Sequence, residues 1–170
     1  MDEKTIALRL ALAAILGGVL GLEREVRGQD AGLRTHMLVS LGACCFTLAS
    51  VFIEVPLASS GTPDGARGDI SRIASQVVVG IGFLGAGVIL RHGGQVKGLT
   101  TAANLWLTAS VGLAAGLGFY VAAGATVVIA LVCLVGLRPL ERAIRRYRQR
   151  RGLEADRDVA GSPPDSRDAG

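Results

Sequence analysis

Glycines at positions 80, 82 and 85 give the stretch GIGFLGAGVIL (80–90) a G-x-G-x-x-G pattern. This pattern can cradle a dinucleotide when it joins a strand to an amphipathic helix, with an acid about 20 residues further on for the ribose. Here the next acid is Glu141, and the residues after Gly85 stay apolar up to Arg91. We therefore expect no cofactor, and interpret the glycines as small residues that let membrane helices pack closely. Small residues four positions apart also occur at Gly17/Gly21 and Gly112/Gly116.

Few polar side chains interrupt the long apolar runs, and the most notable are Gln76, Thr100 and Asn104. Thr100 and Asn104 are four residues apart, so they share one face of a helix. Polar groups inside a membrane are costly enough to need a reason. Two interpretations remain open: interhelical hydrogen bonds, worth about 1 kcal/mol each, or a polar path or ligand pocket between the third and fourth apolar runs.

Ionisable residues gather where apolar runs end: Glu23, Arg24, Arg34, Asp69 and Arg72. We expect the first three to lie in the first connection, and Asp69 to favour the start of a helix by complementing its dipole. One hypothesis is a collar of ion pairs that fixes helix register. The alternative is functional: Glu23 as a cation or proton site, and Arg24 and Arg34 as contacts for an acidic partner or phosphate.

No arrangement typical of catalysis is found in the sequence. His36 and His92 have no nucleophile or acid at a recognisable spacing, and His36 is interpreted as a capping or interfacial residue. We therefore expect a protein that is not an enzyme.

Composition and hydropathy indicate the elements that position these residues. The 170 residues are 50% hydrophobic but only 4% aromatic, with a mean hydropathy of +0.46. A membrane helix needs about 20 apolar residues, and the uncharged run 98–137 would be roughly 60 Å long as one helix, twice the hydrocarbon core. We predict an all-α membrane protein, a bundle of five transmembrane helices. The spans are expected at about 6–22, 37–57, 73–90, 98–116 and 119–137.

The arginine-rich stretch 138–151 is predicted to be a short basic juxtamembrane helix, amphipathic through Leu140, Ile144 and Tyr147. It either lies on anionic lipid or continues the last span as a solvated helix. Its position beside an apolar run favours a lipid surface over nucleic acid as its partner. Residues 152–170 are expected to be a disordered tail. Because Lys and Arg mark cytoplasmic loops, the N-terminus is predicted outside and the C-terminus inside.

Three stretches together resemble the MgtC/SapB family of bacterial inner-membrane proteins. They are GLEREVRGQDAGLRTHMLVSLGA (21–43), DISRIASQVVVGIGFLGAGVILR (69–91) and VKGLTTAANLWLTASVGLAAGLGFY (96–120). The resemblance covers about residues 5–140 and implies a five-span plasma-membrane protein linked to growth at low magnesium. In one branch it also implies virulence, with restraint of the F-type ATP synthase as a possible activity. The charged candidates match the family motifs ER, AGLRT and DxxRIAxQ.

Virulence-type members of that family carry a sizeable soluble C-terminal domain, whereas only about 30 polar residues follow the apolar part here, too few for a core of their own. The leading prediction is regulation of ion homeostasis or membrane energetics under magnesium limitation, through contact with another membrane complex. The alternative is direct transport of Mg²⁺ or another cation. The glycine-rich helices are also compatible with a homo-oligomer.

Overall fold

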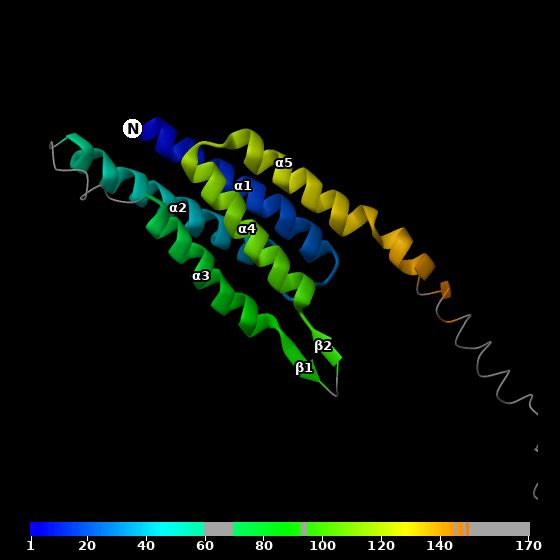
Figure 1. Cartoon of the computed structure of the whole chain (residues 1–170). Coiled ribbons are helices and arrows are strands. Elements are labelled where there is room, and N and C mark those ends of the chain that lie inside the picture. The colour runs from blue at the N-terminus through cyan, green and yellow to red at the C-terminus, as the bar shows by residue number, and fades with distance from the viewer. Residues whose placement is uncertain (60–69, 93–94, 145, 148, 150–170) are drawn as a thin grey trace, which may run out of the picture. The chain divides into compact units, whose positions relative to one another are not determined.

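The computed structural model describes residues 1–59, 70–92, 95–144, 146–147 and 149 (Figure 1). For residues 53–59, 70–74, 90–92 and 95 the description covers the backbone only. The predicted disordered tail 152–170 lies outside the described residues. The chain forms two compact units, Met1–Leu131 and Val132–Gly170, and the candidate site lies within the first.

The first unit is built from helices, with one short hairpin. Its elements are α1 (Glu3–Val26), α2 (Leu33–Ser59), α3 (Ile70–Val88), β1 (Leu90–His92), β2 (Gln95–Lys97), α4 (Leu99–Leu117) and α5 (Tyr120–Leu131). Strands β1 and β2 pair antiparallel, with Arg91 opposite Val96. The helical class agrees with the sequence-based prediction, but the hairpin was not foreseen, because these residues had been assigned to an irregular connection.

Three helices are long and apolar enough to cross a membrane: Glu3–Val26, Leu33–Phe52 and Tyr120–Ile144. The apolar part of α3 that was searched, Ser75–Val88, is shorter than a span, and α4 does not qualify. Threonines and Asn104 lower the mean hydropathy of α4, although its 19 residues are enough in length. Among the described residues, the structure thus gives three candidate spans rather than the five expected.

Helix α2 is the centre of the first unit: it contacts α1, α3 and α4, and α4 also contacts α1, α3 and α5 (Figure 1). Small residues bring the backbones together. A Cβ atom added at Gly21 of α1 would lie 2.7 Å from the Leu33 Cα, and one at Gly116 of α4 would lie 2.7 Å from the Thr47 Cβ. Both glycines therefore permit close packing against α2.

The glycines of α3 behave differently from the expectation. Cβ atoms added at Gly80, Gly82 or Gly87 would meet no described atom within 4 Å, and one at Gly85 would meet only Ala102 in ordinary contact. Most of the glycines in the G-x-G-x-x-G stretch therefore do not mediate packing within the described chain. They leave open space along α3 instead.

The second unit begins with the π-helical segment Val132–Gly136, followed by helical residues at 138–144. The Arg138 Nε donates to the Leu134 carbonyl at 2.7 Å. Leu140, Ile144 and Tyr147 are exposed. Part of the predicted basic helix, including residues 150–151, lies outside the described residues, so an amphipathic helix over 138–151 stays a prediction.

Candidate functional site

A buried polar cluster lies where α1, α2 and α4 meet. It is formed by four buried residues, Arg24, His36, Thr101 and Asn104, and by the exposed Gln29 at its edge, and hydrogen bonds join these residues in two groups. The side chains of Arg24, His36, Thr101 and Asn104 are each at most 5% exposed. Burying such groups is expensive unless hydrogen bonds replace water, so the bonds within the cluster are needed for these helices to pack.

The end of α1 turns the chain back toward the cluster. The Gln29 N–H bonds to the Arg24 carbonyl and the Gly28 N–H to the Glu25 carbonyl, the two bonds of a Schellman motif. Gly28 has a φ of +62°, a left-handed conformation that glycine adopts without steric cost. As a result, the Gln29 side chain reaches back along α1, where its Oε1 accepts from Arg24 Nη2 at 2.9 Å.

The start of α2 is fixed by the same segment. The Glu25 carboxylate accepts from the backbone N–H of Leu33 at 3.0 Å, so it satisfies one of the unpaired donors of the first turn and complements the helix dipole. A side chain at Gly32 would overlap this carboxylate. Glu25 therefore joins the end of α1 to the beginning of α2.

Arg24 is the only charged side chain among the described residues that is fully buried, at 3% exposed. Its Nη2 donates to Thr101 Oγ1 of α4 at 2.8 Å as well as to Gln29. Hydrogen bonds to charged groups contribute about 1.5–3 kcal/mol each. The Nε atom has no hydrogen-bond partner among the described residues, so the guanidinium is held on one side only.

His36 links α2 to α4. Its Nδ1 lies 2.8 Å from the Gly32 carbonyl, which can only accept, so Nδ1 carries the proton. Nε2 is then free to accept from Asn104 Nδ2 at 3.0 Å. The side chain of His36 is 0% exposed, which shows that the interpretation as a capping or interfacial residue was wrong.

Further hydroxyl groups extend this polar surface along the same interface. Thr108 donates to the Asn104 carbonyl at 2.8 Å, and Thr47 donates to the Ala43 carbonyl at 2.8 Å. Such bonds satisfy hydroxyls within their own helices. Ser40 is fully buried, and its Oγ has no hydrogen-bond partner in the described part of the chain.

The charged candidates do not occupy the connection in which the sequence analysis placed them. Glu23 and Arg24 lie inside α1, and Arg34 lies inside α2. Both helices extend past the predicted ends because the polar groups at their termini find partners within the protein. Glu23 forms an ion pair with Arg27, one turn further along.

The remaining candidates are scattered. Arg34 and Thr100 are exposed, and Gln76 is exposed on α3, away from the partners of Asn104. Arg72 lies in α3, but its side chain is outside the description, and Asp69 is outside the described residues altogether. Of the six candidates whose side chains the structure describes, it brings Arg24 and Asn104 into the buried polar cluster.

Sequence reasoning did not identify His36 or Gln29 as members. A signal was available for His36, because it shares a face of α2 with Ser40, Ala43 and Thr47 at i, i+4, i+7 and i+11. This is a stripe of small and polar residues on an otherwise apolar helix. All four are buried. Gln29 gave no such signal, since its role depends on the turn at Gly28.

The chemistry of the buried polar cluster is better suited to holding the helices in position than to catalysing a reaction. Its hydrogen bonds connect α1, α2 and α4, and its buried charge is the guanidinium of Arg24, which donates to Thr101 and Gln29. Among the described residues, no group of three His, Cys, Asp or Glu side chains could hold a metal ion.

Comparison with known proteins identifies relatives over most of the chain. The sequence profile of the MgtC family matches residues 10–143. The chain is 47% identical to the "Putative magnesium transporter YhiD" of Escherichia coli (strain K12), over 66% of this chain and 51% of that protein. It is 43% identical to the "Protein MgtC" of Salmonella typhimurium (strain LT2), over 86% of this chain and 60% of that protein.

A further relative is the "Uncharacterized protein slr0014" of Synechocystis, 44% identical over 85% of this chain and 57% of that protein. The chain thus spans between about half and three fifths of the length of the curated relatives it matches. No solved structure matches. With a family profile that covers most of its length, and with apolar helices long enough to cross a bilayer, this chain is a membrane protein that belongs to the MgtC family.

Proposed function

We propose that this protein regulates ion homeostasis or membrane energetics under magnesium limitation, through contact with another membrane complex such as the F-type ATP synthase. In this proposal it is not an enzyme. It crosses the bacterial plasma membrane five times, with its N-terminus outside and its C-terminus in the cytoplasm. The names of its relatives support a link to magnesium.

The observation that carries the regulatory proposal is the position of Arg24. A fixed positive charge, 3% exposed and bonded to Thr101, lies in the buried polar cluster between three helices. A divalent cation on a path through this cluster would pass close to the Arg24 guanidinium, which would repel it, although the Glu23 and Asp30 carboxylates lie near enough to weaken that repulsion. The cluster instead fits a role in fixing the α1–α2 connection and the first turn of α2, which present exposed Asp30 and Arg34 to a partner.

The test compares Arg34→Ala with the wild-type protein for a membrane complex that co-purifies after mild detergent extraction. Arg34 is exposed, so its removal should leave the fold intact while weakening the complex. The matched control is Lys4→Ala, which removes an exposed cation at the other end of the α1–α2 pair. Equal yields of the complex from all three proteins would contradict the proposal.

The second candidate is direct transport of Mg²⁺ or another cation, which the printed name of the YhiD relative favours. Purified protein in proteoliposomes is the appropriate system. Mg²⁺ flux that disappears in Asn104→Ala and Glu23→Gln, but persists in Thr100→Ala, would support the transport proposal and contradict the regulatory one. Absence of flux from folded wild-type protein would favour the regulatory proposal.

The basic segment after Leu137 is proposed to contact anionic lipid. Leu140 and Ile144 are exposed, and so are Arg142 and Arg146. An apolar stripe beside cationic side chains is the arrangement that interfacial helices use. Binding of the purified protein to vesicles of anionic lipid should fall as the salt concentration increases, because salt screens the attraction between the basic side chains and the lipid headgroups.

A further inference from the structure

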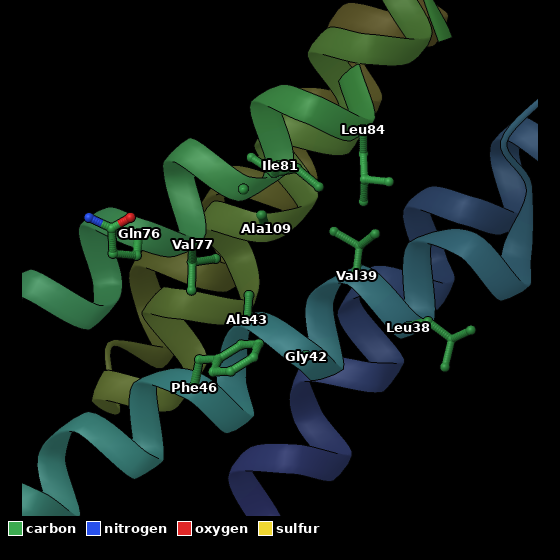
Figure 2. Close-up of a pocket in the computed structure, with 11 residues that line it drawn as sticks. Leu38, Val39, Gly42, Ala43, Phe46, Gln76, Val77, Ile81, Leu84 and Ala109 are labelled. Carbon is green, nitrogen blue, oxygen red and sulfur yellow. The ribbon is translucent and has the colours of Figure 1, made fainter. Parts of the chain in front are cut away.

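An apolar groove runs between α2 and α3, with α4 beneath it. Figure 2 shows side chains from both helices lining it, with Phe46 and Gln76 toward one end and Leu38 and Leu84 toward the other. Its volume is about 610 Å³, within the range of roughly 300–1,000 Å³ usual for small-ligand sites. Among the residues whose side chains the structure describes, Gln76 is the one polar side chain that lines it.

Two glycines create this space. Gly42 of α2 and Gly80 of α3 both line the groove, and a Cβ atom added at either would meet no described atom within 4 Å. Larger residues at these positions would fill the groove without displacing the helices. Gly80, one of the open glycines of α3, therefore has a structural consequence, although it does not pack against another helix in the described part of the chain.

The depth and chemistry of the groove restrict its occupant. Its α2 wall, from Leu38 to Phe46, lies within the candidate membrane span Leu33–Phe52. Water has little to bind there, because a water molecule needs two to four polar partners and an apolar cavity binds hydrocarbon instead. With a single amide at one end, the groove suits an amphipathic molecule that is mostly hydrocarbon.

The dimensions distinguish a hydrocarbon tail from a helix. Between Gln76 and Leu84, α3 rises about 12 Å, at about 1.5 Å per residue. A helix is at least about 10 Å wide. A hydrocarbon chain is only about 4 Å across, the packing distance of carbon atoms. This width is close to that of the side chains which Gly42 and Gly80 lack, so a tail matches the space that these glycines leave more closely than a helix does.

We infer that the groove between α2 and α3 binds an acyl tail of a membrane phospholipid, with Gln76 at the end of the groove nearer the lipid's polar part. The lipid would be a bound component of the protein, distinct from the bulk lipid around it. By filling the groove, it would hold α3 against α2.

The experiment measures retained lipid by native mass spectrometry, after reconstitution in vesicles of phosphatidylethanolamine and phosphatidylglycerol and mild detergent extraction. Gly80→Leu and Gly42→Leu each place a side chain in the groove. Gly82→Leu is the matched control, because Gly82 is also open on α3 but does not line the groove. Equal thermal stability of the three variants would show that the fold is retained.

We expect wild type and Gly82→Leu to retain a phospholipid, and Gly80→Leu and Gly42→Leu to retain roughly tenfold less, because displacing about two methylene groups weakens binding by that factor. A photoactivatable acyl tail should label residues 38–46 and 76–84 in wild type, with the same loss in the groove variants. Equal retention in all four proteins, or none in wild type, would overturn the inference. Retention of a free fatty acid in place of a phospholipid would also overturn the inference. So would the finding that the protein is a dimer which Gly80→Leu abolishes.

Discussion

The Asn104 side-chain amide in α4 donates to the His36 imidazole in α2 at 3.0 Å, across a separation of 68 positions in the chain. Neither side chain is more than 5% exposed, so each depends on the other to replace water. The pair joins the second and fourth helices, and its geometry also sets which imidazole nitrogen carries the proton, because the Gly32 carbonyl occupies the other side.

Replacing Asn104 by Leu should lower the free energy of unfolding in detergent by about 1–3 kcal/mol, because the buried His36 acceptor loses its donor. In a double-mutant cycle with His36→Leu, the loss should be less than additive by about 0.5–2 kcal/mol. Chemical unfolding followed by circular dichroism measures both quantities. Thr100→Leu, exposed on the same helix, is the control. Strict additivity would mean that the hydrogen bond does not couple the two residues.

Arg24→Gln should be destabilising where Arg34→Gln is not. The first removes bonds to Thr101 and Gln29 inside the protein and should cost about 1–3 kcal/mol, with part of the loss offset because a buried charge is removed. The second alters an exposed side chain and should change stability by no more than about 0.5 kcal/mol. Thermal unfolding of both variants in the same micelle tests the contrast, and similar melting temperatures would contradict it.

Glycine substitutions should separate close packing from helix propensity. In Gly21→Ala the new methyl would approach the Leu33 Cα to 2.7 Å, and pushing α1 from α2 should cost about 1–3 kcal/mol. In Gly124→Ala, within α5, the methyl meets no described atom within 4 Å, so stability should rise by up to about 1 kcal/mol. Unfolding measurements in which both substitutions stabilise the protein, or both destabilise it, would refute this account of the α1–α2 interface.

Arg9 should stabilise the end of α4. Its Nη1 donates to the Gly116 carbonyl at 2.6 Å and its Nε to the Tyr120 hydroxyl at 3.2 Å. A cation at a helix C-terminus is favoured by the dipole and by the unpaired carbonyls, so Arg9→Gln should cost about 0.5–2 kcal/mol. Tyr120→Phe removes only the longer bond and should cost less. Thermal unfolding of both variants measures the two losses of stability. A larger loss in Tyr120→Phe than in Arg9→Gln would assign the stabilisation to Tyr120 instead of Arg9.

Hydropathy was sufficient to predict a helical membrane protein, because each apolar run is long compared with its connections. It was less reliable at helix ends. The charged residues Glu23–Glu25 were taken as the end of the first span, yet α1 continues through Arg24 to Val26, since Thr101 and Gln29 supply hydrogen bonds that water would otherwise provide. Helix α4 falls short as a candidate span because its threonines and Asn104 lower its mean hydropathy.

The candidate site was only partly predictable. Asn104 stands out as an amide in an uncharged run, and Arg24 as a charge beside one, so residue type alone identified both. Their partners depend on which helices become neighbours. One of the two interpretations placed Gln76 and Asn104 on a polar path between the third and fourth runs, but Asn104 faces His36 on α2, while Gln76 lines the groove on α3. Helix rotation, which determines this, leaves little trace in helices that are apolar on every side.

The capped turn between α1 and α2 has a consequence for synthesis. These two helices can pair as soon as both have left the ribosome, whereas Thr101 follows Arg24 by 77 positions and Asn104 follows His36 by 68. At about 5–20 residues per second, the delay is roughly 3 to 15 seconds. Until α4 is made, the nascent α1–α2 hairpin carries a guanidinium and an imidazole whose partners on α4 do not yet exist. Water, lipid headgroups or the insertion machinery must solvate them until α4 arrives.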